Sequence, residues 1–238
     1  MENLDMRNFI NWNILQRIEN SPKEFIVQRN VALLDAFLLG YEDFFLQLEN
    51  EEQLKAKYSD VPSIDEYARN KYSADNIGTR SFKSIISFTC EDERDFFDKY
   101  FEFLKSYEQE YPVQETVVYR LKEKPFVLKE LLIGMRKRYC MYFGNYDIAC
   151  LRAFLDGYFL CKKEYTTPFT TFDTKLREFT ESITCEALNL TGEFVTWDRF
   201  YRYDRDWSAW GKIDEITAKK ILEEFWTDLE KFTGETVN

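Results

Sequence analysis

The sequence contains no histidine and few of the residues that interrupt regular structure. Its 238 residues include only 8 Gly and 5 Pro, which are thinly spread. Because Gly and Pro mark turns, such a chain keeps long uninterrupted segments, which is typical of a helical protein rather than of a sandwich or barrel. The absence of His removes the commonest general base and the commonest metal ligand. We therefore expect a helical protein that holds no metal and no cofactor.

Motifs that position a nucleophile or a phosphate are also missing. The sequence has no Gly-rich phosphate loop, no nucleophile elbow and no Ser/His/Asp pattern. The cysteines, at positions 90, 140, 150, 161 and 185, form no CxxC pair, and four of them have apolar neighbours, which predicts reduced core residues. A carboxylate-only enzyme stays formally possible, because 43 acidic residues always allow some pair. No pair is singled out, so we predict that the protein is not an enzyme.

Basic residues are in the minority, since 32 Lys and Arg stand against 43 Asp and Glu, for a net charge of −11. This excess of negative charge argues against nucleic acid or an anionic membrane surface as the partner and favours a protein with a basic face. The alternative is that an acidic surface merely keeps a cytosolic protein soluble. The opening MENLDMRNFINW lacks the basic and apolar regions of a signal peptide, and no apolar stretch is long enough to span a bilayer. We expect a cytoplasmic protein.

A ten-residue phrase occurs twice. It reads ALLDAFLLGY at residues 32–41 and ACLRAFLDGY at residues 149–158, with seven identical positions at an offset of 117. Both copies lie in long amphipathic stretches, and each keeps a glycine, Gly40 or Gly157, inside the helical pattern. Since Gly weakens a helix by about 1 kcal/mol relative to Ala, its recurrence predicts a close helix crossing that a Cβ would block.

The apolar periodicity predicts helices over residues 8–19, 30–48, 64–72 and 81–88, and an aromatic helix over 96–107 with Thr89 as its N-cap. The second half repeats this plan from residue 126, and its closing helix follows Asp214, which falls on Thr89 in the alignment and is also a good N-cap.

The repeat predicts an all-α fold with two tandem repeats of about five helices each, related by an approximate two-fold axis. The first repeat covers residues 1–110, a connector covers 111–125, and the second covers 126–238. The second copy has an insertion near residues 165–193, for which we expect an extra helix over 175–188.

The run MRKRYCMYFG at residues 135–144, followed by LRAFLDGY at 151–158, resembles a motif of a bacterial immunity-protein-like family. In that family a basic run and a proline precede Met-Tyr-x-Gly and the LRAFLDGY helix; a Trp-containing helix and an FFxLLxxF helix follow, matched here by residues 207–213 and 225–232. This chain departs from the motif at Tyr139, where proline is expected, although the first copy has Pro22 at that position. The resemblance implies a cytoplasmic antitoxin that binds and neutralises a cognate protein toxin. The alternative is a non-catalytic helical scaffold or regulatory protein for another bacterial or phage factor.

Two acidic segments are candidate contact surfaces for such a toxin. The segment 197–207 interleaves aromatic and charged residues, and Trp and Tyr often dominate protein interfaces. The acids in this segment argue against base stacking, and the alternative is that its aromatics pack into the second core. The predicted partner-binding residues are Trp197, Asp198, Tyr201, Tyr203, Asp204, Asp206 and Trp207, with Glu42, Asp43, Glu49, Glu51 and Glu52 in the acidic run of the first half.

Two further groups of charges have a structural and a functional interpretation. The basic run Arg136 to Arg138 could bind a phosphate or an acidic partner, or it could complement the dipole at the end of a helix. Arg152 and Asp156 could act together as an electrophile and an acid, but their spacing is that of a surface i,i+4 salt bridge, which we expect.

Overall fold

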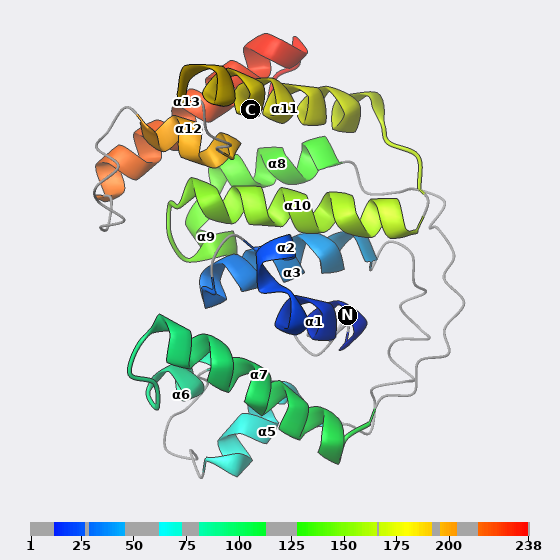
Figure 1. The fold of residues 1–238 in the computed structure, drawn as a ribbon, viewed down its shortest axis with the longest axis vertical. Coiled ribbons are helices and arrows are strands. Elements are labelled where there is room, and N and C mark those ends of the chain that lie inside the picture. Colours follow the sequence, from blue (N-terminus) through cyan, green and yellow to red (C-terminus); the bar gives the residue numbers. More distant parts are fainter. Residues whose placement is uncertain are drawn as a thin grey trace. The chain divides into compact units, whose positions relative to one another are not determined.

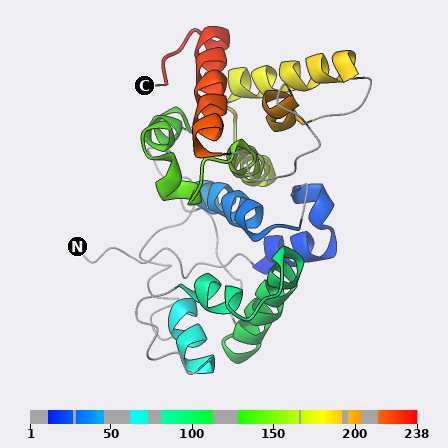
Figure 2. The ribbon, with the colours of Figure 1, turned by 90° about the vertical axis from the view of Figure 1, so that its left-hand side faces the viewer.

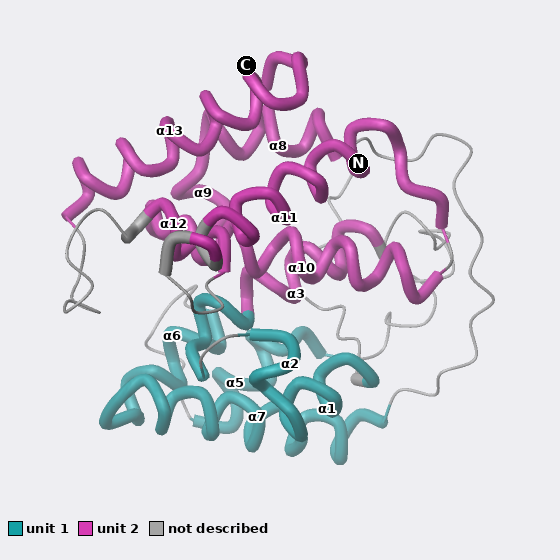
Figure 3. Tube along the Cα trace, turned by 45° about the horizontal axis from the view of Figure 1, so that its top comes forward, with its two compact units in different colours: residues 1–34, 46–123 teal, residues 35–45, 124–238 magenta. Residues whose placement is uncertain are grey.

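A computed structural model describes residues 12–26, 29–45, 62–72, 81–112, 128–165, 167–191, 196–203 and 214–237. All regular structure in these ranges is helical (Figure 1, Figure 2), so the predicted all-α class is confirmed for the part of the chain that is described. The contacts divide the chain into two compact units (Figure 3). Unit 1 comprises residues 1–34 and 46–123, and unit 2 comprises residues 35–45 and 124–238.

Unit 1 is organised around the aromatic face of one long helix. Its elements are α1 (Trp12–Asn20), α2 (Pro22–Phe25), the first residues of α3 (Val31–Phe45), α5 (Ile64–Lys71), α6 (Phe82–Ser87) and α7 (Glu93–Glu110). Tyr67 of α5 packs on Phe103 and Tyr107 of α7, with ring centroids 5.4 and 5.2 Å apart. The Tyr107 hydroxyl donates a hydrogen bond to the Pro62 carbonyl oxygen at 2.8 Å, and burial raises the pKa of Tyr107 to about 12. Large rings therefore make up the part of this core that lies between α5 and α7.

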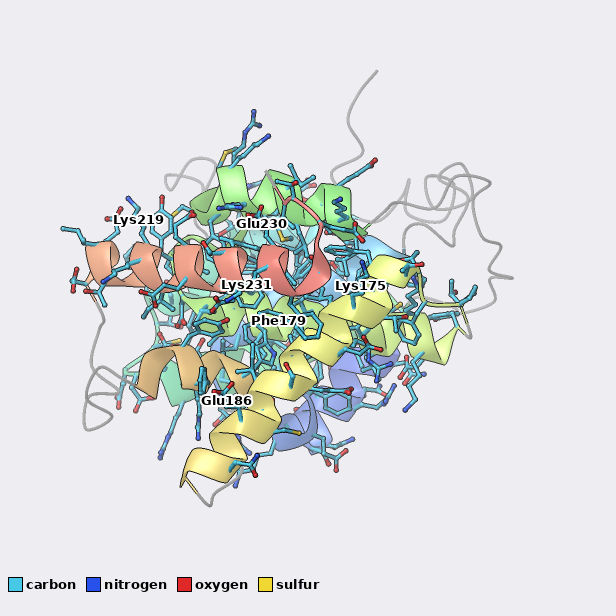
Figure 4. The ribbon with its side chains drawn as sticks, turned by 90° about the horizontal axis from the view of Figure 1, so that it is seen from above. Lys175, Phe179, Glu186, Lys219, Glu230 and Lys231 are labelled. Atoms are coloured by element: carbon cyan, nitrogen blue, oxygen red, sulfur yellow. The ribbon has the colours of Figure 1, made fainter. Side chains whose placement is uncertain are left out.

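Unit 2 surrounds a central helix, α10 (Ile148–Glu164), whose side chains are buried on almost every face. The rest of α3 joins α8 (Leu128–Lys137), α9 (Tyr139–Phe143), α11 (Thr171–Thr191), α12 (Trp197–Tyr203) and α13 (Glu215–Thr233) around it. Phe179 lies where α11 crosses α13 (Figure 4), with its ring 5.7 Å from Phe225 and 5.4 Å from Phe232. Phe179, Phe225 and Phe232 thus form an aromatic cluster in unit 2, and Phe179 comes from α11, a helix that belongs to the predicted insertion.

The two glycines of the repeated phrase meet inside unit 2. A Cβ placed on Gly40 of α3 would lie 1.9 Å from the Phe154 carbonyl oxygen, and one placed on Gly157 of α10 would lie 2.0 Å from the Phe37 carbonyl oxygen. Gly40 corresponds to Gly157, and Phe37 to Phe154, at the offset of 117. The contact is therefore reciprocal, and the predicted close helix crossing is confirmed.

The start of α7 differs from the prediction. This helix begins at Glu93, and the carboxylate of Asp92 accepts hydrogen bonds from the backbone N–H groups of Arg94 and Asp95 at 2.8 Å each. Thr89 is not the N-cap, because its hydroxyl donates to the Ile86 carbonyl oxygen at 2.7 Å instead. A carboxylate is favoured at the helix start because it accepts from the free N–H groups and opposes the positive end of the helix dipole. Asp214 caps α13 in the same way, as predicted.

The Asp92 cap leads to a stability prediction. Replacing Asp92 with Ala is expected to lower the free energy of unfolding by about 1 kcal/mol, because two helix N–H groups lose their acceptor. Urea unfolding followed by circular dichroism measures the effect, and Glu102→Gln, an exposed change in the middle of α7, is the control that should leave stability unchanged within about 0.5 kcal/mol. A smaller loss for Asp92→Ala than for the control would contradict this assignment.

The extra helix in the insertion is longer than predicted. We expected residues 175–188, whereas α11 runs from Thr171 to Thr191. The additional first turn arises from a capping box, in which the Thr170 hydroxyl oxygen accepts from the Asp173 N–H at 3.1 Å and the Asp173 carboxylate accepts from the Thr170 N–H at 2.7 Å. The pattern Thr-x-x-Asp is visible in the sequence and could have located this start.

Candidate functional site

A guanidinium lies buried between two carboxylates in unit 2. Arg152 of α10 is 6% exposed, and its Nε lies 2.9 Å from Oδ1 of Asp198, which is 4% exposed. The Arg152 Nη1 lies 2.5 Å from Oδ2 of Asp156, one helical turn further along α10. The expected i,i+4 salt bridge between Arg152 and Asp156 is therefore present. It differs from the expectation in one respect, because Arg152 lies in the interior and has a second carboxylate partner on α12.

The packing of α12 brings Asp198 to this position. Trp197, the preceding residue, stacks on Phe225 of α13 with ring centroids 4.9 Å apart and an interplanar angle of 24°. Tyr201, one turn later, packs edge-on against the same Phe225, and its hydroxyl donates to Oδ2 of Asp228 at 3.1 Å. With these two rings held, Asp198 faces α10. No sequence spacing links Asp198 to Arg152, so periodicity could not reveal this third member.

Only the second copy of the phrase holds this cluster. The first copy has Asp35 at the position of Arg152 and Leu39 at the position of Asp156. Of the contacts in the cluster, the one between Nε of Arg152 and Asp198 is an ion pair rather than an aligned hydrogen bond. One guanidinium and two ionised carboxylates together carry a net negative charge. Charged side chains are tolerated in a protein interior only when they are paired with opposite charges. The two copies of the phrase therefore differ in charge at the positions that form this cluster.

Asp156 has an unusual proton affinity. Desolvation by the surrounding protein raises the pKa of Asp156 to about 6, and the nearby Asp198 raises it further, while Arg152 acts in the opposite direction. The side chain is 43% exposed, so the carboxyl group is only partly shielded from solvent. This group can hold a proton near neutral pH, but among the described residues no cluster of Cys, Asp and Glu could bind a metal.

The raised pKa of Asp156 makes stability depend on pH. The folded state holds the proton more tightly than the unfolded state, whose pKa stays near 3.8. This group therefore adds stability as the pH falls from about 7 to about 5 and removes it as the pH rises through the folded pKa. We expect Asp156→Asn to flatten this part of the profile of unfolding free energy against pH, measured by urea titration.

The control for this experiment is Glu178→Gln, an exposed change on α11. This variant should keep the slope of the parent protein between about pH 7 and pH 5. Asp43 contributes with the same sign, because burial raises the pKa of Asp43 to about 6, so the slope is reduced rather than abolished in the Asp156→Asn variant. A steeper gain in stability on acidification for Asp156→Asn than for the parent would contradict the assignment.

A second buried ion pair joins α10 to the start of α11. The Lys162 Nζ lies 2.5 Å from Oδ2 of Asp173, and both side chains are almost completely buried. The ammonium group also lies over the rings of Phe44, Tyr158 and Phe169 at 5.6 to 5.8 Å from their centroids. Asp173 also belongs to the capping box of α11, so the ion pair holds the start of the insertion against α10. The role of this pair is therefore structural. Sequence reasoning missed Lys162, since its neighbours in the sequence give no sign of burial.

The predicted partner-binding residues separate into three groups. Trp197, Asp198 and Tyr201 are buried in unit 2, which fits the alternative that the aromatics of this segment pack into the second core. Tyr203 is the last residue of α12. Asp204, Asp206 and Trp207 lie outside the described residues.

The acidic run of the first half is described only at its beginning. Glu42 and Asp43 lie near the end of α3 and are partly buried. Glu49, Glu51 and Glu52 lie outside the described residues. Their role in binding a partner stays a prediction.

The basic run at the end of α8 has two different parts. Arg136 bridges to α13, with Nη1 2.9 Å from Oε1 of Glu230 and Nη2 2.9 Å from Oε2 of Glu223. The Arg136 Nη1 also donates a hydrogen bond to the carbonyl oxygen of Val237 at 3.4 Å. Arg136 therefore contacts the segment after α13 as well. Lys137 and Arg138 are exposed. Arg136 is therefore an interhelical anchor, whereas the next two residues are accessible.

The cysteines are all free thiols, and no disulfide joins them. Cys150 and Cys161 are buried, Cys90 and Cys140 are partly buried, and Cys185 is exposed on α11. The predicted core location is confirmed for Cys150 and Cys161, whereas Cys185 is not a core residue. None of the helices in the described ranges has both the length and the apolar character needed to cross a bilayer.

Comparisons with protein-family models, curated proteins and solved structures found no match to this chain.

Proposed function

We propose that this chain is a cytoplasmic immunity protein, which binds and neutralises a cognate protein toxin and has no catalytic activity. The observation that carries the proposal is the net charge of −11, which suits the capture of a protein with a basic face. Complementary charge speeds association and suppresses wrong partners, as an inhibitor that must reach a toxin early requires. The resemblance of residues 135–158 to an immunity-protein motif supports the same class.

The structure offers an acidic surface of the kind such a partner would meet. The exposed side of α11 carries Glu178, Glu181 and Glu186, and no basic residue occurs in this helix after Arg177. Arg177 is paired with Glu181 at 3.4 Å, whereas neither Glu178 nor Glu186 has an ion-pair partner among the described residues. Glu186 lies near α12, at the opposite end of α11 from Lys175 (Figure 4). This acidic side of α11 adds to the contact residues predicted from the sequence.

We further propose that the chain arose by tandem duplication and that its two repeats are related by an approximate two-fold axis. The reciprocal contact of Gly40 and Gly157 supports this, since equivalent residues exchange roles as they do across an isologous interface. A repeat that once paired with an identical copy would keep its crossing residues and could diverge elsewhere. Arg152 and its acidic partners are one such divergence.

A helical scaffold or regulator of another bacterial or phage factor is the second candidate. It would share the helical fold, the acidic charge and the duplication. It differs in its partner, which need not be toxic.

The proposal is tested by expressing the product of the adjacent gene in cells with and without this chain. An immunity protein restores growth that the neighbour arrests, and it forms a complex with that protein whose association slows as salt increases. A harmless neighbour, or a toxic one against which this chain gives neither protection nor a complex, removes the immunity function and leaves the scaffold.

Charge reversals locate the binding surface. Replacing Glu49, Glu51 and Glu52 with Lys tests the predicted acidic run, and replacing Glu178 and Glu186 with Lys tests the side of α11. Either change in a true contact surface should slow association by at least about tenfold. A matched control reverses Glu91, Glu93 and Glu102, which are exposed acids on and beside α7 in unit 1.

A further inference from the structure

Exposed cations lie close together at one place on unit 2. Lys137 and Arg138, at the junction of α8 and α9, are exposed, and so are Lys219 and Lys220 in the first turns of α13. These four exposed cations come from two elements of a chain whose net charge is −11.

Side-chain contacts bring these two elements together. The Lys219 Nζ lies 4.5 Å from the centroid of the Tyr146 ring, and Tyr146 stacks with Tyr139 of α9 at 6.1 Å. The ion pair of Arg136 with Glu223 holds the end of α8 against the next turn of α13. The junction of α8 and α9 and the beginning of α13 therefore form one continuous surface within unit 2.

Three of the four exposed cations on this surface are not paired with an acid among the described residues. Glu223 is engaged by Arg136, and Glu215 is paired with Lys219. Lys137, Arg138 and Lys220 have no ion-pair partner within the described ranges. These three charges are available to a ligand.

The same surface carries the two most exposed large apolar side chains of the described residues. Met141 on α9 is 76% exposed, and Ile216 on α13 is 81% exposed. Ile216 lies one turn before Lys220, so the two share a face of α13. Single exposed apolar residues are common, but here both border unpaired cations, which is the composition of a contact surface.

We propose that Lys137, Arg138, Met141, Ile216 and Lys220 form a basic apolar patch that docks an acidic, partly apolar segment of a partner protein. Carboxylates of the segment pair with the three cations, and its apolar side chains cover Met141 and Ile216. Met suits such a role because its flexible thioether adapts to different apolar surfaces. A protein segment is favoured over nucleic acid or an anionic bilayer because it contacts the patch alone, whereas an extended polyanion would also meet the acidic remainder of the molecule.

This inference goes beyond the proposed function and does not depend on it. The toxin is expected to present a basic face to acidic surfaces, whereas the patch would bind a segment of the opposite charge. Failure of one proposal leaves the other in place, because the two sets of charge reversals do not overlap.

The test uses the full chain as bait for a library of random peptides of helical length. Enriched peptides should be rich in Asp and Glu with apolar residues at helical spacing, and they should bind the parent protein in solution. The patch variant Lys137→Glu, Arg138→Glu, Lys220→Glu should weaken that binding by at least about tenfold. The apolar variant Met141→Ser, Ile216→Ser keeps the charges and should also weaken it, by about threefold or more.

The control variant Lys23→Glu, Lys163→Glu, Lys231→Glu makes the same change of net charge at exposed lysines elsewhere and should bind the peptides within about twofold of the parent. Urea unfolding checks that all variants fold, and Lys137→Gln with Lys220→Gln replaces the patch variant if it does not. The proposal is overturned if no peptide is enriched, if the enriched peptides are not acidic, or if they bind the patch variant as well as the parent. It is also overturned if a single-stranded oligonucleotide or vesicles containing phosphatidylglycerol bind through the patch more tightly than the peptides.

Discussion

Replacing Gly157 with Ala is expected to lower the free energy of unfolding of unit 2 by at least about 2 kcal/mol. The new Cβ would lie 2.0 Å from the carbonyl oxygen of Phe37, which belongs to a helix backbone and cannot rotate away. The helices must separate, and the contacts along α3 and α10 are lost with them. The better helix propensity of Ala recovers only about 1 kcal/mol of this loss. Urea unfolding of the purified protein measures the difference.

Gly40→Ala should have a similar effect, because its Cβ would lie 1.9 Å from the Phe154 carbonyl oxygen. The matched control is Gly134→Ala on α8, where the nearest atom is the Tyr142 hydroxyl at 3.3 Å, at the end of a side chain that can move. That control should be neutral or more stable by up to about 1 kcal/mol. If Gly157→Ala unfolds at the same urea concentration as Gly134→Ala, the close crossing does not exist in solution.

Replacing Lys162 with Met is expected to destabilise the protein by about 3–5 kcal/mol. The substitution keeps most of the apolar stem but leaves Asp173 buried beside three aromatic rings without its cation. The control is Lys163→Met, the exposed neighbour on α10, which should change stability by less than about 0.5 kcal/mol.

A second substitution separates the charge from the packing. Asp173→Asn in the Lys162→Met background removes the unpaired charge, while its carbonyl oxygen can still accept the Thr170 N–H in the capping box. The double variant should therefore recover a large part of the lost stability. If Lys162→Met alone loses less than about 1 kcal/mol, the ion pair is too solvated to matter.

Most of the helices could be predicted from the sequence, because the apolar stripes have a helical period and the breaks fall at Pro or polar runs. The helix of residues 64–72 and that of 81–88 agree with α5 and α6 to within one residue at each end. The Gly40 and Gly157 crossing was predictable as well, since only a close backbone contact explains a helical glycine kept in both copies. Thr89 was mistaken for a cap because Asp92, three residues later, is an equally good candidate by type and only geometry separates them.

The buried charges could not be predicted. Arg152 and Lys162 belong to the types most often found at the surface, and their burial depends on carboxylates that arrive from helices far along the chain. Asp198 and Asp173 supply those carboxylates. Likewise, Arg136 forms ion pairs whereas Lys137 and Arg138 are exposed, and this difference depends on the position of α13. The local sequence around residues 136–138 gives no information on that position.

The crossing of α3 and α10 has a consequence for synthesis on the ribosome. Phe37 and Gly40 leave the ribosome early, whereas the residues they contact, Gly157 and Phe154, are 120 and 114 positions later in the chain. At about 5–20 residues per second, α3 waits roughly 6–23 seconds for its partner helix. During that interval Phe37, Tyr41 and Phe44, which are buried in the finished protein, lack the surface that covers them. The apolar face of α3 therefore stays exposed on the nascent chain until α10 has emerged.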